Sequence, residues 1–126
     1  LIAAEGYMMG GQSANAIIKL NDLRTARAIT GQSNVLSASE EAQVTVKDIN
    51  VILDERAREL CGEQQRWFDL KRTGKLLERI TTYNGSAKIN IKNFHTLRPI
   101  PTPQIDAVTN LTSGPDPDGF WQNSGY

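Results

Sequence analysis

All five prolines of this chain lie beyond residue 98, between Pro99 and Pro117. Proline lacks a backbone N–H and its ring clashes with the preceding helical turn, so helices can run through residues 1–98 more easily than through the rest. All 14 basic residues also lie at or before Arg98, although 14 acidic residues bring the formal net charge to zero. At 126 residues the chain has the length of one small domain. We therefore expect that domain to have two parts, a helical body at 1–98 and an extended proline-rich C-terminal wrap at 99–126.

The first 29 residues are predicted to form a helical hairpin. Residues 1–9 are helix formers, and Gly10-Gly11 ends that helix because glycine accepts the left-handed conformation common at helix ends. A second helix is expected from Ser13, as N-cap, to about Ile29, because its apolar residues recur at three- and four-residue spacing. The residues close to the pattern of one tetratricopeptide repeat are Tyr7, Gly11, Ala16, Ile17 and Leu20. No second copy follows at a period of about 34 residues, so an ordinary packed hairpin stays open as the alternative.

The middle of the body is predicted to be a loop followed by a helix. Residues 30–44 are rich in Ser, Thr, Asn, Gln and Gly, which indicates a surface loop. Thr45 and Asp48 then resemble a capping box, with Asp in place of the usual Glu. This pattern predicts a helix from about Val46 to Cys61.

A further helix is expected from Gln65 to about Ile80, with Gly62 and Gly74 as positions where the axis can bend or break. Beyond it, Ile89-Asn90-Ile91 alternates like a short strand. Prolines then predict an extended backbone over residues 97–103, because each proline fixes its own φ and restricts the residue before it. The fold class is therefore mainly α, with tetratricopeptide-like helical hairpins and an irregular proline-rich C-terminal tail.

The densest group of charged residues lies between Glu55 and Arg72. At 100° per residue, the apolar stripe of the helix from Val46 to Cys61 consists of Ile49, Ile52, Leu53, Ala57 and Leu60. Arg56 and Glu63 fall within the same stripe, and buried charges need partners. We therefore expect a structural ion-pair network that joins two helices, with Arg56 and Glu63 as its inward members. Its predicted members are Glu55, Arg56, Arg58, Glu59, Glu63, Arg66, Asp69 and Arg72.

Glu59 and Glu63 also offer two carboxyl groups one helical turn apart, as general acid–base catalysis can use. However, a glycosidase needs carboxyl groups that face each other across a substrate, and neighbours on one helix face point the same way. Arginines three or four residues away would also keep such carboxylates ionised, whereas a general acid must hold a proton. We therefore expect no enzyme activity and no catalytic residue.

None of the isolated residues that could take part in metal binding or nucleophilic chemistry is interpreted as a functional site. His95 has no second His or Cys nearby, so neither a zinc site nor a catalytic triad is expected. Cys61 is interpreted as a small buried hydrophobe rather than a nucleophile. Residues 116–119 (Asp-Pro-Asp-Gly) lack the third acidic position and the distal Glu of a calcium loop, so a tight turn is expected. The sequence therefore indicates no metal and no cofactor.

Two further patterns could involve carbohydrate. Asn84-Gly85-Ser86 and Asn110-Leu111-Thr112 match the glycosylation acceptor, which is short enough to arise often by chance. Phe120 and Trp121 can offer flat rings on which a sugar stacks, although a tail anchored by its own aromatic residues explains the pair equally well.

Composition excludes two kinds of partner. Non-specific binding of nucleic acid requires an excess of basic residues, and a net charge of zero gives no such excess. No run of 18 apolar residues is present, so no membrane-spanning helix is expected.

The chain opens Leu1-Ile2-Ala3-Ala4-Glu5 without Met, signal peptide or capping residue, which is typical of entry into the middle of a helix. We expect a fragment or a processed chain that has lost its localisation signals.

Five segments together resemble one protein family. The run from Glu55 to Arg72 is similar to the E-R-x-R-E-L and E-x-x-R-W-x-D-L-x-R signature near the C-terminus of SusD/RagB-like outer-membrane lipoproteins of the Bacteroidota. The other segments follow the family's order: Leu1–Arg24 resembles its A-E-x-Y helix, glycine turn and I-N-x-L-R helix, Thr45–Leu53 its lead-in to the signature, Leu97–Asp106 its L-R-P-I-P-x-x-x-I-D stretch, and Asn123–Tyr126 its N-P-G-Y. Ser124 replaces the usual proline of the last motif, and Gln64 stands where glycine is common.

This resemblance implies a mainly α-helical, lipid-anchored protein on the surface of the cell outer membrane. Such proteins cap a SusC-like TonB-dependent transporter and capture glycans, or sometimes peptides, for import without cleaving them. Because they run to several hundred residues, the chain would be a C-terminal scaffold segment that packs on the rest of its own polypeptide. The glycan-contacting aromatic residues of the family lie mostly upstream of this segment, so the ligand-binding residues are unknown.

A second function, from a different class, stays open. A tetratricopeptide-like adaptor would bind peptide or protein partners in solution instead of capturing a nutrient at a membrane. The two functions differ in the parent reading frame, because a lipoprotein begins with a signal peptide and an adaptor carries further repeats of about 34 residues.

Overall fold

The computed structural model describes residues 1–108 and 122–126, and within these ranges the only regular secondary structure is helical. This confirms the mainly α fold. The helices are α1 (Ile2–Met9), α2 (Ser13–Arg27), α3 (Ala38–Thr45), α4 (Ile49–Glu59), α5 (Arg66–Arg72), α6 (Leu76–Tyr83), the 3₁₀ helix η1 (Asn93–Thr96) and α7 (Thr102–Asp106).

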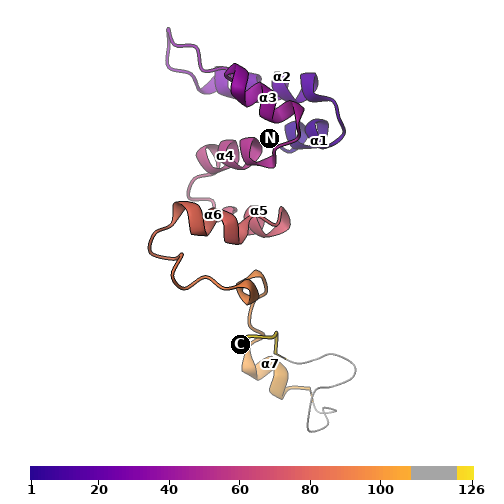
Figure 1. Cartoon of the computed structure of the whole chain (residues 1–126), viewed down its shortest axis with the longest axis vertical. Coiled ribbons are helices and arrows are strands. Elements are labelled where there is room, and N and C mark those ends of the chain that lie inside the picture. Colours follow the sequence, from indigo (N-terminus) through magenta and orange to yellow (C-terminus); the bar gives the residue numbers. More distant parts are fainter. Residues whose placement is uncertain (109–121) are drawn as a thin grey trace. The chain divides into compact units, whose positions relative to one another are not determined.

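The chain divides into two compact units, Leu1–Thr73 and Gly74–Tyr126. The first unit holds α1 to α5 and the second holds α6, η1 and α7 (Figure 1). The division at residue 98, which rests on composition, is a different boundary and stays a prediction.

α1 and α2 form the predicted hairpin. α1 ends at Met9 with Gly10 as its C-cap, and α2 runs from Ser13 to Arg27, two residues short of the expected Ile29. Ala4 and Met8 of α1 belong to the same buried cluster as Ala16 and Leu20 of α2, and all four side chains are fully buried. The likeness of this hairpin to a tetratricopeptide repeat stays a prediction.

The expectation of a loop over residues 30–44 is wrong in its second half, because α3 begins at Ala38. Ser37 caps this helix: its hydroxyl accepts from the backbone N of Glu40, and the Glu40 carboxylate accepts from the backbone N of Ser37. This capping box supplies the bonds that the first turn of a short helix lacks. The pattern at Thr45 and Asp48 is not a capping box, because Thr45 is the last residue of α3.

α4 begins later than predicted, at Ile49, and Asp48 acts as its N-cap by accepting from the backbone N of Asn50 at 3.0 Å. Ile52 and Leu53 are fully buried, as the apolar stripe predicts. Val51 is also buried, so the buried side of α4 is broader than that stripe.

The single helix expected from Gln65 to Ile80 is two helices. α5 ends at Arg72 and α6 begins at Leu76. Between them Gly74 has φ +70°, a left-handed conformation that side chains disfavour and glycine adopts without strain. The break therefore occurs at one of the two glycines at which the sequence allows it.

The second unit contains two further departures from the expected structure. Residues 89–91 do not form a strand but lie in a turn in which the backbone N of Ile91 donates to the carbonyl of Ala87. The extended segment ends at Pro101, because α7 starts at Thr102. Pro103 lies in the first turn of α7, where a helix tolerates proline because no N–H is needed there.

Residues 122–126 form a neutral clamp on residues 97–100. The Gln122 amide makes two bonds with Ile100, because its Oε1 accepts from the backbone N at 2.7 Å and its Nε2 donates to the carbonyl at 2.9 Å. Tyr126 Oη donates to the Leu97 carbonyl at 2.8 Å. Asn123 Nδ2 donates to the Arg98 carbonyl. We call Gln122, Asn123 and Tyr126 the C-terminal clamp.

Gly125 is required by the geometry of this clamp. Its φ is +102°, and a Cβ placed on it would lie 2.4 Å from Cγ of Phe94. The Phe94 ring packs edge-on against Tyr126, with 5.1 Å between ring centroids. A glycine is therefore needed for the chain to pass this close to Phe94 while Tyr126 reaches Leu97.

Candidate functional site

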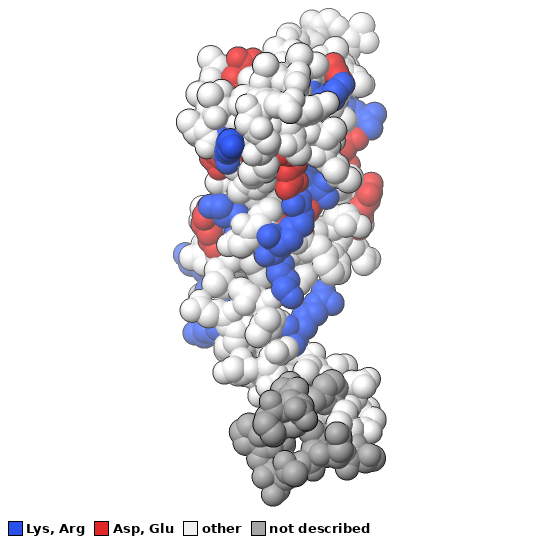
Figure 2. Space-filling model, turned by 90° about the vertical axis from the view of Figure 1, so that its right-hand side faces the viewer, with Lys and Arg blue, Asp and Glu red and all other residues white. Residues whose placement is uncertain are grey.

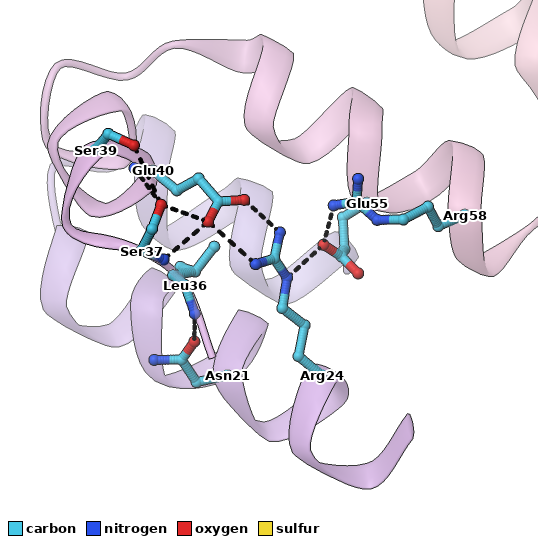
Figure 3. Close-up of polar contacts among 8 residues, drawn as sticks. All are labelled: Asn21, Arg24, Leu36, Ser37, Ser39, Glu40, Glu55 and Arg58. Carbon is cyan, nitrogen blue, oxygen red and sulfur yellow. Dashed lines mark hydrogen bonds and ion pairs between the residues drawn. The ribbon is translucent and has the colours of Figure 1, made fainter. Parts of the chain in front are cut away.

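Arg24 binds carboxylates from two other helices and so links α2, α3 and α4 (Figure 3). Its Nη2 donates to Oε1 of Glu40 at 2.7 Å, and its Nε donates to Oε2 of Glu55 at 2.8 Å. Arg24 is only 9% exposed and Glu55 only 6%. A buried arginine needs this complete set of acceptors, because an unpaired charge in the interior costs several kcal/mol.

Glu40 has two roles at this point, since it also closes the capping box of α3. Its Oε2 accepts from the Ser37 hydroxyl and from the backbone N of Ser37, each at 2.8 Å. The hydrogen bond from Arg24 is the main cause that lowers the pKa of Glu40 from 4.5 to about 2. The same hydrogen bond raises the pKa of Arg24 above its ordinary value. Both groups therefore stay charged at every physiological pH.

Glu55 also pairs with Arg58, which lies one turn further along α4. Arg58 Nη2 is 2.6 Å from Glu55 Oε2. The Arg58 side chain is 57% exposed, whereas that of Arg24 is 10% exposed. One buried and one exposed arginine thus share a single carboxylate oxygen, which makes the two a natural pair for comparison.

A second group of charges surrounds Asp69 of α5, which is 4% exposed. Arg56 Nε of α4 donates to its Oδ2 at 2.6 Å, and Arg72 of α5 binds its Oδ1 at 3.0 Å. Arg72 also donates to Glu5 of α1, with Nη2 at 2.8 Å from Oε2. The hydrogen bond with Glu5 is the main cause that raises the pKa of Arg72. This group therefore links α1, α4 and α5 through side chains alone.

The predicted network members therefore fall into separate groups instead of one network. Glu55 and Arg58 lie in the Arg24 group, and Arg56, Asp69 and Arg72 lie in the Asp69 group. Glu59 pairs with Arg27 on the surface, and Arg66 donates to the Leu53 carbonyl.

Glu63 contributes to none of these pairs, so its expected place as an inward member of the network is wrong. Glu63 is exposed, because α4 ends at Glu59 and the helical stripe does not continue as far as residue 63. Arg56 meets Asp69 in its place.

Four partners lie outside the charged run and were missed: Glu5, Arg24, Arg27 and Glu40. Arg24 follows Ala16 and Leu20 at intervals of four, so the helical period alone could have predicted that it lies on the buried face of α2. Ser37 and Glu40 have the spacing of a capping box, which could have predicted the start of α3. No local pattern indicates that Glu5 would meet Arg72, which is 67 residues away.

A polar hollow of ≈ 530 Å³ lies over the Arg24 group and is lined by Arg24, Arg27, Asn34, Glu40, Glu55, Arg58 and Glu59. Its arginines and glutamates bind one another, so the hollow carries no unpaired charge to attract an ionic ligand. The lowered pKa of Glu40 and that of Glu59, lowered by its hydrogen bond with Arg27, keep these carboxylates ionised. Residues in this state hold helices together and are poor general acids.

No group of three potential ligand side chains that could hold a metal is found in residues 1–108 and 122–126. Within the same ranges, no helix is long and apolar enough to cross a membrane. One face of the molecule, drawn in Figure 2, has acidic side chains next to basic ones at several places.

Three of the isolated candidate residues, Cys61, Asn84 and His95, lie within the described residues. Cys61 is exposed, so its interpretation as a buried residue is wrong, and the reason is that it lies in the turn after α4. His95 packs against Phe94, and its Nδ1 accepts from the backbone N of Lys92. Asn84 is exposed and its side-chain oxygen accepts from the backbone N of Ala87. The predictions for Asn110, for the 116–119 turn and for Phe120 and Trp121 lie outside the described residues.

Comparison with known proteins identifies the family. The SusD family matches residues 1–126. SusD-like protein P38 of Formosa agariphila is 36% identical over 87 residues, which are 68% of this chain and 17% of P38. SusD-like protein P2 of the same organism is 35% identical over 115 residues, which are 88% of this chain and 22% of P2. The chain thus spans about a fifth of the length of these relatives, and no solved structure matches it. The chain belongs to the SusD family.

Proposed function

We propose that the protein is a non-catalytic binding protein that captures a glycan or another nutrient at the surface of the outer membrane. It would be anchored there by a lipid and pass the nutrient to a SusC-like TonB-dependent transporter. The observation that carries this proposal is the match of the SusD family over the whole of residues 1–126, together with two SusD-like relatives at 36% and 35% identity.

Residues 1–126 would serve this function as a scaffold segment. Apart from Glu63, the arginines and carboxylates of the Glu55–Arg72 run contact one another or neighbouring helices, and the most buried of them, Glu55 and Asp69, each bind two arginines. Side chains occupied in this way fix the angles between helices and leave little for a ligand. The nutrient would be bound by residues outside this segment.

Binding and turnover by the full-length protein test this function. Affinity gels and calorimetry against a panel of polysaccharides, oligosaccharides and peptides should reveal a glycan or a peptide nutrient that is bound without release of new reducing ends. Protease treatment of intact cells should remove the protein, and pull-down from solubilised membranes should recover a TonB-dependent transporter. Release of reducing ends would contradict the non-catalytic assignment. Binding of peptides by a protein that is neither on the cell surface nor recovered with a transporter would instead support an adaptor.

The scaffold role is tested by Arg58→Met and Arg24→Met in the same full-length protein. Both substitutions remove a partner of Glu55, but only Arg24 is buried. We expect Arg24→Met to lower stability while the folded fraction binds the nutrient with unchanged Kd. A Kd that weakens in Arg58→Met, without loss of stability, would place the ligand on this segment.

A further inference from the structure

α1 is apolar on nearly all sides but is covered on only one. Glu5 is the only charged residue among its eight, Ile-Ala-Ala-Glu-Gly-Tyr-Met-Met. Ala4 and Met8 are fully buried, whereas Ile2 is 81% exposed and Met9 45% exposed. A helix that is hydrophobic around its whole circumference is typical of one surrounded by protein. The exposed side of α1 is therefore an unpartnered helix face.

This exposed side is hollowed. Ile2, Gly6 and Met9 follow one another at four and three residues along α1, and with Glu5, Arg56 and Arg72 they line a groove of ≈ 460 Å³. A Cβ placed on Gly6 would meet nothing within 4 Å, so the groove is open at its glycine. We call the surface formed by Ile2, Gly6 and Met9 the α1 groove. Next to it, a second hollow shares Ile2 and Arg56 and is lined by both apolar and acidic residues, among them Leu23, Leu60 and Glu63.

The charged side chains that line the α1 groove itself are already paired. Both carboxylate oxygens of Glu5 accept from Arg72, and Arg56 is bound to Asp69. An apolar segment can therefore cover the groove without burying an unpaired charge, which would otherwise oppose its binding. An ionic ligand finds no free charge there, so the chemistry of the groove favours a helix with an apolar face.

We infer that a helix from elsewhere in the same polypeptide, outside residues 1–126, packs into the α1 groove. The matched parts make up only 17% and 22% of the two SusD-like relatives, so a protein of their length has ample chain to supply this helix. Gly6, between Ile2 and Met9, lets a second helix approach closely, since packing of ridges into grooves depends on such a low point. This interface concerns the assembly of the fold and is independent of the nutrient that is bound.

The sign of one substitution tests the inference in the full-length protein. Gly6→Leu improves helix propensity and, in an uncovered groove with open space at Gly6, would raise Tm. If a helix occupies the groove, the new side chain clashes with it, and we expect Tm to fall by at least about 2 °C. Ala14→Leu, at an exposed position of α2, is the matched control and should change Tm by less than about 1 °C. A Tm that rises or stays the same in Gly6→Leu overturns the inference.

A second measurement needs no substitution. Met8 is fully buried and Met9 is 45% exposed, so the two neighbours report on opposite sides of α1. With hydrogen peroxide and peptide mass spectrometry, we expect Met9 of the full-length protein to oxidise within about twofold of the rate of Met8, because oxidation follows exposure. Fast oxidation of Met9 at all protein concentrations overturns the inference. Protection of Met9 that disappears on dilution also overturns it, since the occupant would then be a second copy.

Discussion

The two units are held by different chemistry. In Leu1–Thr73, charged side chains join helices that are far apart in sequence, such as Arg24 to Glu55 and Arg72 to Glu5. In Gly74–Tyr126, the C-terminal clamp joins residues 122–126 to residues 97–100 by neutral side chains on backbone groups. The stability of the first unit should therefore depend on its charged side chains and fall in acid. The stability of the second should depend on the room available around its backbone.

The largest expected effect is that of Arg24→Met. It leaves the buried Glu55 with only the exposed Arg58 and removes the arginine from Glu40. We expect the free energy of unfolding in urea to fall by about 3–5 kcal/mol, the usual result of breaking a buried pair. Arg58→Met, at the same carboxylate oxygen but on the surface, should lose at most about 1 kcal/mol. Equal losses in the two variants would contradict the difference drawn between buried and exposed arginines.

Gly125→Ala should have the largest effect on the second unit. The new Cβ would lie 2.4 Å from Cγ of Phe94 at a φ of +102°, and we expect a cost of about 2 kcal/mol. The measurement is hydrogen exchange of the Ile100 amide, which donates to Gln122 and should exchange at least about tenfold faster. Gly85→Ala, where a Cβ meets nothing within 4 Å, is the control and should leave this rate unchanged. An unchanged rate in both variants would show that the clamp does not depend on Gly125.

Acid should loosen the first unit before it loosens the C-terminal clamp. The pKa of Glu40 is about 2 in the folded protein against an ordinary 4.5. A lowered folded pKa gives stability that is complete above about 4.5 and is lost as the pH falls through about 2. The amides of Gln122 and Asn123 do not titrate, so protection of the Ile100 amide should change less.

Glu40→Gln tests the assignment of this acid response. Urea unfolding at several pH values between 6 and 2 should show a smaller pH dependence in the variant than in the original chain, by up to about one proton per molecule. The variant should also be less stable at pH 6, because the amide replaces a charged partner of Arg24. If the two pH dependences are the same, Glu40 is not the residue whose protonation loosens the unit.

The smallest expected effect is a gain. Gln64 has φ +59°, in the left-handed region that strains residues with a side chain. Gln64→Gly should therefore raise the free energy of unfolding by about 0.5–1 kcal/mol. Lys47 has a similar φ of 60°, but its Nζ also donates to the Met9 carbonyl at the end of α1. Lys47→Gly should gain less, and an equal gain would mean that this bond contributes nothing.

Much of the helical content could be predicted because it is encoded locally. The α1–α2 hairpin follows from apolar spacing and from Gly10-Gly11, and the break near Gly74 follows from glycine. α3 was missed because it is short and polar, with only Val44 buried, so its periodicity is weak. Its Ser37 capping box is a local signal for a helix start. The similar pattern at Thr45 and Asp48 instead predicted a helix start at about Val46.

The partners of the charged residues could not be predicted in the same way. That Arg56 needed a counter-charge followed from the sequence, but its pairing with Asp69 instead of a neighbour on its own helix depends on the turn between α4 and α5. The structure also brings together segments that are separate in the sequence and carry the resemblance to the family. Glu5 and Arg24 of the first segment bind Arg72 and Glu55 at the two ends of the charged run. Likewise, residues 123–126 contact residues 97–98 through hydrogen bonds.

The central claim is that the charged run is a scaffold whose buried ions stabilise the fold by pairing. A double-mutant cycle between Arg56 and Asp69 tests it most directly, because their side chains are only 12% and 5% exposed and lie 2.6 Å apart. Urea unfolding of Arg56→Ala, Asp69→Ala and the double variant should give a coupling of about 1.5–3 kcal/mol between the two residues. A coupling below about 0.5 kcal/mol would mean that the residues act independently, and it would contradict the scaffold role of the run.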